Sequence, residues 1–177
     1  MKRFLLLSIN VALAGSLALA DVPESPPDAA EQARQLHRNR ELVKMLVDHS
    51  VDLAGAEDPI RRAEYCNKVA ESFASAIKQA ADERDGERAC ELGLHFRDVL
   101  RDGVASNLVA VGIPPDSPGR ADLLKISNAV IELTDPLELR LRRALDAEHQ
   151  PQLERALRSV QDGRAGVEAA LKNRGSK

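Results

Sequence analysis

Apolar residues recur at steps of three and four positions along most of this chain, and no stretch sustains an alternation of apolar and polar residues. Steps of three and four place side chains on one face of an α-helix, whereas alternation indicates a strand. The clearest run consists of small and apolar residues: Ala63, Cys66, Ala70, Phe73, Ile77 and Ala80. The pattern predicts an all-α fold, a bundle of about five to six amphipathic helices.

Two start signals define the first two helices. Asp28 can cap a helix that runs to about Gly55, and Asp58-Pro59 can begin a second one. Aspartate accepts hydrogen bonds from free N–H groups, and proline suits the first helical turn. The first helix carries apolar residues at roughly helical spacing: Leu36, Val43, Leu46, Val47 and Leu53.

Asp85-Gly86 predicts a tight turn between the second helix and a third. Asp85 tolerates left-handed backbone geometry, and Gly86 can end a helix. One long helix through Gly86 is the alternative, because an isolated glycine costs only about 1 kcal/mol. The inner face predicted for the third helix is Ala89, Gly93, Phe96, Leu100 and Val104.

Prolines divide the second half of the chain. The proline-rich segment 112–118 joins halves 28–111 and 119–172 of a single helical domain, 28–172. Beyond it an apolar stripe continues through Pro136, which predicts either a kinked helix or two helices stacked end to end. Pro151 opens the last helix, and 173–177 is a polar tail expected to be disordered. The two stripes are Leu123, Ile126, Val130, Leu133, Leu137, Leu141 and Leu145, then Leu153, Leu157, Val160, Val167 and Leu171.

The two halves share several residues at one constant spacing. Leu46, Val47, Ser50, Leu53, Asp58, Pro59, Asp85 and Gly86 are matched by Leu123, Leu124, Ser127, Val130, Asp135, Pro136, Asp162 and Gly163. Duplication of a helical hairpin would explain this, and so would chance coincidence among amphipathic helices.

Residues 1–20 have the order of a secretory signal peptide. Lys2 and Arg3 precede a mostly apolar stretch that ends in Ala18-Leu19-Ala20, a small-residue cleavage site. Retention as an N-terminal anchor is the alternative, although the apolar part is short and interrupted by polar residues. Segment 21–27 contains three prolines and reads as a flexible leader. We expect an exported protein, periplasmic or extracellular, with no transmembrane segment after cleavage.

The chain has a formal net charge of −3, and only 2% of its residues are aromatic. Cleavage after Ala20 removes Lys2 and Arg3 but no acidic residue, so the mature chain is more acidic. Nucleic-acid binding needs a basic surface, often with aromatic side chains for stacking. The composition therefore predicts no nucleic-acid partner.

No sequence motif indicates catalysis or cofactor binding. The chain lacks a phosphate-binding glycine loop, a zinc histidine pair, a Cys-x-x-Cys pair, a G-x-S-x-G elbow and an EF-hand loop. The histidines His37, His49, His95 and His149 have no repeated ligand spacing and are interpreted as ordinary surface or half-buried residues. We assign no catalytic, cofactor-binding or metal-binding residue and expect no enzyme activity.

Two stretches are rich in basic residues. The first is Arg34, His37, Arg38, Arg40 and Lys44, and the second is Arg140, Arg142, Arg143, Arg155 and Arg158. Either could contact an acidic partner or an anionic surface. The simpler interpretation is a solvated helix face paired with nearby acids: Glu41 and Asp48 in the first case, Glu138, Asp146 and Glu154 in the second.

The two cysteines, Cys66 and Cys90, are predicted to be free. If the chain turns near Gly86, their heights along the hairpin differ by about 24 Å, whereas a disulfide needs Cα atoms within about 7 Å. An internal bridge is the alternative, because the protein is expected to be exported and the count is even.

These observations favour an exported, non-enzymatic helical module that acts through contact with an unidentified protein, as an envelope adaptor, inhibitor or stress-related binding protein. The alternative is a carrier with a ligand or metal site inside the helical bundle, where helical proteins commonly place such sites. Self-association is compatible with both hypotheses.

Overall fold

The computed structural model describes residues 29–111, 119–147 and 149–172, whose regular structure is entirely helical. The predicted all-α bundle is confirmed. The signal peptide 1–20, leader 21–27, cap Asp28, joining segment 112–118 and tail 173–177 lie outside the described residues. The elements are α1 (Ala29–Gly55), α2 (Pro59–Asp82), α3 (Gly86–Asp98), the π-helical segment η1 (Val99–Ala105), α4 (Ser106–Ala110), α5 (Gly119–Ala147) and α6 (Pro151–Lys172).

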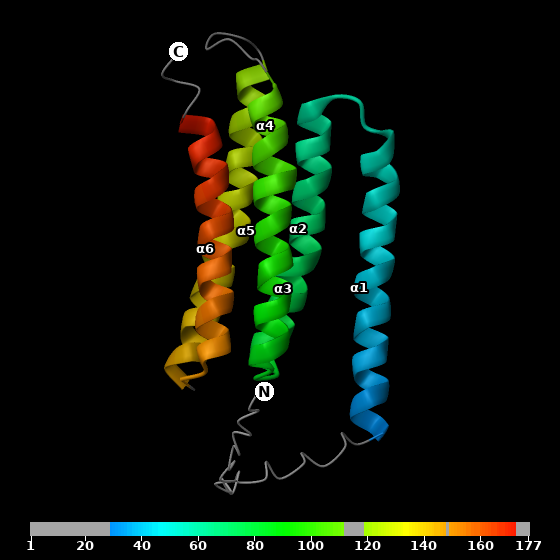
Figure 1. The fold of residues 1–177 in the computed structure, drawn as a ribbon, viewed down its shortest axis with the longest axis vertical. Coiled ribbons are helices and arrows are strands. Elements are labelled where there is room, and N and C mark those ends of the chain that lie inside the picture. The colour runs from blue at the N-terminus through cyan, green and yellow to red at the C-terminus, as the bar shows by residue number, and fades with distance from the viewer. Residues whose placement is uncertain (1–28, 112–118, 148, 173–177) are drawn as a thin grey trace, which may run out of the picture.

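Four long rods form a bundle, and α1 lies beside it (Figure 1). Because α3, η1 and α4 follow one another with helical backbone angles, they make one rod over residues 86–110. In the bundle, α2 and α6 each pack against both α3 and α5, and successive rods run antiparallel. The main packing contact of α1 is with α2, which leaves α1 at the edge of the molecule.

The beginning of α2 confirms the sequence prediction. The side chain of Asp58 accepts hydrogen bonds from the backbone N–H groups of Ile60 and Arg61, at 3.4 and 3.3 Å, and Pro59 is the first helical residue. These bonds satisfy N–H groups that have no partner within the helix. The predicted helix end at Gly55 is also observed.

The turn between α2 and α3 lies where Asp85-Gly86 predicted it, so the alternative of one long helix is wrong. The left-handed residue, however, is Arg84, with φ of 61°. The N–H of Asp85 donates to the carbonyl of Ala80 at 2.9 Å, and that of Arg84 donates to Ala81 at 3.3 Å. This is the Schellman pattern, in which glycine usually holds the left-handed position.

Asp85 and Gly86 have other roles in this turn. The Asp85 side chain caps α3 by accepting a hydrogen bond from the backbone N–H of Arg88 at 3.0 Å. Gly86 is the first residue of α3, and a Cβ on it would overlap the side-chain oxygen of Gln150. Packing against the α5–α6 connection, rather than left-handed geometry, therefore favours glycine at this position, although the Gln150 side chain could move aside.

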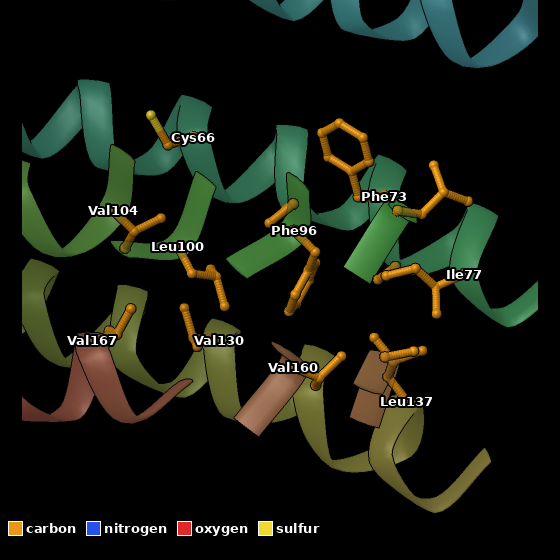
Figure 2. Close-up of a cluster of buried hydrophobic side chains, with 14 of the residues drawn as sticks. Cys66, Phe73, Ile77, Phe96, Leu100, Val104, Val130, Leu137, Val160 and Val167 are labelled. Atoms are coloured by element: carbon orange, nitrogen blue, oxygen red, sulfur yellow. The ribbon is translucent and has the colours of Figure 1, made fainter. Parts of the chain in front are cut away.

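The predicted inner faces of α2 and of the following rod are buried throughout. Figure 2 shows Phe96 and Leu100 between α2 on one side and the side chains of Val130 and Val160 on the other. Phe96, Leu100 and Val160 are completely buried. Burial of aliphatic and aromatic side chains is the main force that holds such a bundle together.

The rod over 86–110 and α6 approach each other closely. A Cβ on Gly93 would lie 3.2 Å from the Cα atom of Ala156, and one on Gly163 would lie 3.2 Å from the Cα atom of Arg97. Both neighbours are backbone atoms, which cannot rotate away. The absence of side chains at these two glycines thus allows the close packing of α3 on α6.

The π-helical segment η1 was not predicted from the sequence. It lies where the rod passes Cys66 of α2, with the Sγ atom 2.8 Å from the place that a Cβ of Gly103 would take. Val104 and Leu108 nevertheless stay completely buried, so the rod keeps its apolar face toward the core on both sides of Gly103.

α5 is one helix that continues through Pro136, so the two-helix alternative for this segment is wrong. The hydroxyl of Thr134, which is fully buried, donates to the carbonyl of Val130 at 2.8 Å. Of the residues in the predicted stripe, Leu133 and Leu145 are only partly buried. Pro151 begins α6 as predicted.

The structure does not repeat at the spacing that suggested duplication. Asp58-Pro59 begins α2, whereas its counterpart at Pro136 lies inside α5. Gly86 begins α3, whereas its counterpart Gly163 lies inside α6. The matched dipeptides therefore have different structural roles, which favours chance coincidence over duplication.

Candidate functional site

A groove of about 720 Å³ runs between α1 and α3 and is floored by α2. It exists because α1 packs on α2 and makes no comparable contact with α3. Figure 1 shows α2 between these two helices. Its apolar lining consists of Leu42, Val43 and Leu46 from α1, Phe73 from α2 and Leu92 from α3. We call it the α1–α3 groove.

The outer face of α1 extends this apolar surface beyond the groove. Leu36, Val43, Val47 and Val51 are between 55% and 70% exposed. Val43 lines both the groove and a shallow hollow of about 360 Å³ on the outside of α1. Of the five apolar residues predicted to share one face of this helix, only Leu46 and Leu53 pack against the core. The other three, Leu36, Val43 and Val47, are exposed, so α1 has a wider apolar arc than α2 alone covers.

The α3 wall of the groove is mainly acidic. It presents Asp85, Glu87 and Glu91, together with the single cation Arg88. Asp85 is engaged as the cap of α3. Glu87 and Glu91 make no ion pair with any residue that the structure describes. The rim therefore carries negative charge that is not balanced within the described chain.

An aromatic stack closes one side of the groove. The ring of Phe73 and the imidazole of His95 lie 5.8 Å apart between centroids, with 26° between their planes. Phe73 is 8% exposed, so most of its ring is covered although one edge reaches the groove. The stack joins α2 to α3 and holds this wall in place.

The four histidines do not converge. His37 and His49 lie on α1, His95 stacks on Phe73, and His149 lies between α5 and α6. Over residues 29–111, 119–147 and 149–172 there is no group of three or more metal-ligating side chains. The hypothesis of a metal carrier finds no ligand set in this part of the chain.

The basic stretches are partly paired, by both local and distant acids. Arg142 with Glu138, at 3.6 Å, and Arg158 with Glu154, at 3.1 Å, are the local pairs expected from the sequence. Two other arginines instead pair with the end of α2, as Arg38 with Glu83 and Arg140 with Asp82. These longer-range pairs tie α1 and α5 to the α2–α3 turn.

Cys66 and Cys90 are both free thiols, as predicted. Cys66 faces Gly103, which is roughly 20 Å further along the rod than Cys90. Burial raises the pKa of the Cys66 thiol, and nearby Arg62 opposes this only partly. Cys66 is thus a core residue rather than a reactive group.

The groove was missed in the sequence because its parts come from three helices. The wide apolar arc of α1 was the available signal, since an outer helix with one neighbour needs only one apolar stripe. None of the described helices is both long and apolar enough to cross a membrane. Comparison with protein-family profiles, with curated proteins and with solved structures gave no match for this chain.

Proposed function

We propose that this chain is an exported, non-enzymatic helical module that acts through protein–protein contact. In this proposal, the α1–α3 groove receives an amphipathic helix of a partner protein, and that helix has basic residues along its edges. The observation that carries the proposal is the open apolar floor beside an acidic wall. Grooves of this kind bind helices through apolar anchors spaced three, four and seven residues apart.

The size of the groove suits a short helical segment. On α1 it extends from Asn39 to Leu46, which corresponds to about 10 Å or two helical turns. Val43, which lines the groove and is exposed, would be covered by a bound helix, and a fully buried side chain of this type contributes about 1.5 to 3 kcal/mol. Ordering costs reduce this gain, so we expect affinity in the micromolar range.

Charge selects between possible helices. The unbalanced carboxylates Glu87 and Glu91 favour a partner with lysine or arginine beside its apolar stripe. Such pairs at the rim add specificity and speed of association more than affinity. For the metal form of the alternative, a carrier with its site inside the bundle, the described residues contain no group of three or more metal-ligating side chains.

The direct test uses two synthetic amphipathic helices with the same leucine stripe, one flanked by lysines and one by glutamates. Fluorescence anisotropy with the folded protein should show binding of the lysine peptide, with the glutamate peptide at least about tenfold weaker. Val43→Glu, at an exposed groove position, should abolish binding, and Glu91→Lys should reverse the charge preference.

Val109→Glu provides the matched control, because Val109 is also exposed but lies on α4, outside the groove. Equal binding of both peptides by the wild type, or binding unaffected by Val43→Glu, would contradict the proposal. Sedimentation of the protein alone tests whether a second copy of this chain occupies the groove. A dimer that Val43→Glu dissociates would identify a second copy as the occupant and would exclude a separate partner at this groove.

The export part of the proposal has its own test. We expect the mature protein to begin at Asp21, because Ala18-Leu19-Ala20 offers the small residues that signal peptidase accepts. N-terminal sequencing of the protein recovered from the envelope or medium measures this directly. Membrane-bound protein that still begins at Met1 would show that the segment is an anchor.

A further inference from the structure

A continuous surface of apolar and basic side chains runs along the side of α1 that faces away from the bundle. It consists of six exposed residues: Leu36, Arg40, Val43, Lys44, Val47 and Val51. We call it the α1 outer surface. Its residues follow mostly at steps of three and four, so they share one face of the helix. From its first residue to its last, the surface is about 22 Å long, or roughly four helical turns.

The position of α1 leaves this surface open. The main packing contact of α1 is with α2, and α1 lies at the edge of the molecule (Figure 1). The four apolar side chains of the surface are therefore 55% to 70% exposed. An apolar patch that stays exposed on a folded domain commonly marks a contact with a protein or with a membrane.

The charged side chains of α1 are sorted around the helix. At about 100° per residue, Arg40 and Lys44 lie within about 50° of the centre of the α1 outer surface. The acids of the same stretch lie about 90° to 130° from that centre: Glu41, Asp48 and Asp52. The two cations make no ion pair with any residue that the structure describes. The charge within this apolar surface is therefore entirely positive.

The structure divides the first basic stretch of the sequence into two parts. Arg38 turns toward the bundle and pairs with Glu83, and Arg34 also has an interaction. Neither contributes free charge to the outer side of the helix. Arg40 and Lys44 remain, and both lie among the exposed apolar residues.

We infer that the α1 outer surface binds to the anionic surface of a lipid bilayer. Helices with an apolar face and basic side chains lie in the plane of the membrane interface, with the apolar face at the boundary between headgroups and acyl chains. The long side chains of Arg40 and Lys44 can extend from such a face to the headgroups. Their positive charge selects negative headgroups over neutral ones.

The same charges disfavour a second copy of this chain as the occupant. Two α1 outer surfaces packed together would bring four cations into one contact, without a carboxylate in either surface. Like charges at such distances repel each other, whereas an anionic bilayer neutralises them.

The negative charge of the whole protein does not prevent this contact. The formal net charge is −3, but at about 0.1 M salt charges more than about 10 Å apart are largely screened. The two cations at the contact therefore have more effect than acids elsewhere on the molecule. Binding through four apolar side chains and two cations should be reversible and should weaken as salt is raised.

Co-sedimentation with vesicles tests the inference, with the chain from Asp21 onward, because the apolar stretch before it would bind lipid by itself. The protein should bind phosphatidylglycerol vesicles and bind phosphatidylcholine vesicles much less. Arg40→Gln and Lys44→Gln should each weaken binding by about fivefold, the effect of one charge near an anionic surface. Arg155→Gln is the control, because Arg155 is exposed on α6 and has no described ion pair.

Val47→Glu tests the apolar part of the contact. It should weaken vesicle binding by at least about tenfold, since a valine that enters the interface is replaced by a carboxylate. Val109→Glu should bind like the wild type, because Val109 is similarly exposed but lies on α4. Val47 does not line the α1–α3 groove, so Val47→Glu should keep the peptide binding proposed above. The two proposals can thus fail separately.

Four results would overturn the inference. They are absence of binding to phosphatidylglycerol vesicles, equal binding to phosphatidylcholine vesicles, and vesicle binding that Arg40→Gln or Val47→Glu leaves unchanged. The fourth comes from sedimentation of the protein alone. A dimer that Val47→Glu dissociates would identify a second copy of this chain, rather than a bilayer, as the occupant of the α1 outer surface.

Discussion

The Sγ atom of Cys66 on α2 lies 2.8 Å from the position that a Cβ of Gly103 would occupy in η1, and the Cβ of Cys66 lies at 3.0 Å. Atoms this close would overlap, so Gly103 must stay without a side chain. We expect Gly103→Ala to destabilise the fold by about 1 to 3 kcal/mol, as overpacking of a filled core does. Urea unfolding measures the change.

Gly55→Ala is the matched control, because Gly55 ends α1 with no atom within 4 Å of the added Cβ. It should be neutral or stabilise by up to about 1 kcal/mol, since alanine favours helix. Cys66→Ala removes the nearest atom, so Gly103→Ala should cost less in that background. If the cost of Gly103→Ala did not depend on Cys66, the proposed contact between α2 and η1 would be wrong.

The same burial makes the stability of the protein depend on Cys66 at alkaline pH. The pKa of its thiol is raised chiefly by burial, so the folded state favours the protonated form more than the unfolded state does. The stability that the protonated thiol contributes is complete below the unfolded pKa of about 8.5. It is lost as pH rises through the higher folded value. Wild-type protein should therefore lose more stability than Cys66→Ala between pH 7 and 10.

Urea unfolding at the two pH values, with Cys90→Ala as a second variant, provides the measurement. The difference between the variants, rather than the total loss, isolates the contribution of the Cys66 thiol. An identical loss in wild type and Cys66→Ala would contradict the buried position of the thiol.

The core and the groove should respond differently to loss of an aromatic ring. Phe96 is completely buried in the core of the bundle, whereas Phe73 is 8% exposed and lines the groove beside His95. We expect Phe96→Ala to cost about 3 to 5 kcal/mol through the cavity it leaves. Phe73→Ala should cost less than Phe96→Ala, with a value near the lower end of that range. Chemical denaturation of both variants tests the order, and a reversed order would show that the rod over 86–110 is packed differently.

Local signals in the sequence predicted the helices, because each signal needs only its own segment. Asp58-Pro59 provides its cap and first turn within a few residues, and the α2 stripe follows from spacing alone. The sequence pattern placed the left-handed residue of the next turn wrongly, because Gly86 instead packs against the side chain of Gln150, far away in the chain. That contact depends on how α6 docks on α3, which no local pattern contains.

The candidate sites depended on the same kind of long-range information. Arg140 and Arg143 were recognised as part of a basic stretch, and local acids were expected to pair with it. The observed partner of Arg140 is Asp82, from a helix that precedes it by many residues. Similarly, the apolar arc of α1 was visible in the sequence, but its separation from α3, which opens the groove, follows only from tertiary packing.

The left-handed conformation of Arg84 gives the last prediction. Its φ of 61° brings Cβ of an L-residue close to the backbone, at a cost of about 1 kcal/mol or more, whereas glycine adopts this geometry freely. Arg84→Gly should therefore be more stable than Arg84→Ala by about 0.5 to 1 kcal/mol, because both variants lack the guanidinium group and differ only in the strained Cβ. Thermal or urea unfolding measures the gain.

Arg84→Ala separates the backbone effect from the loss of the guanidinium group. Alanine also lacks the charge but keeps a Cβ, so this variant should not gain the stability that glycine does. Equal stability of the alanine and glycine variants would mean that position 84 is not left-handed in solution, and the turn between α2 and α3 would have to be redrawn.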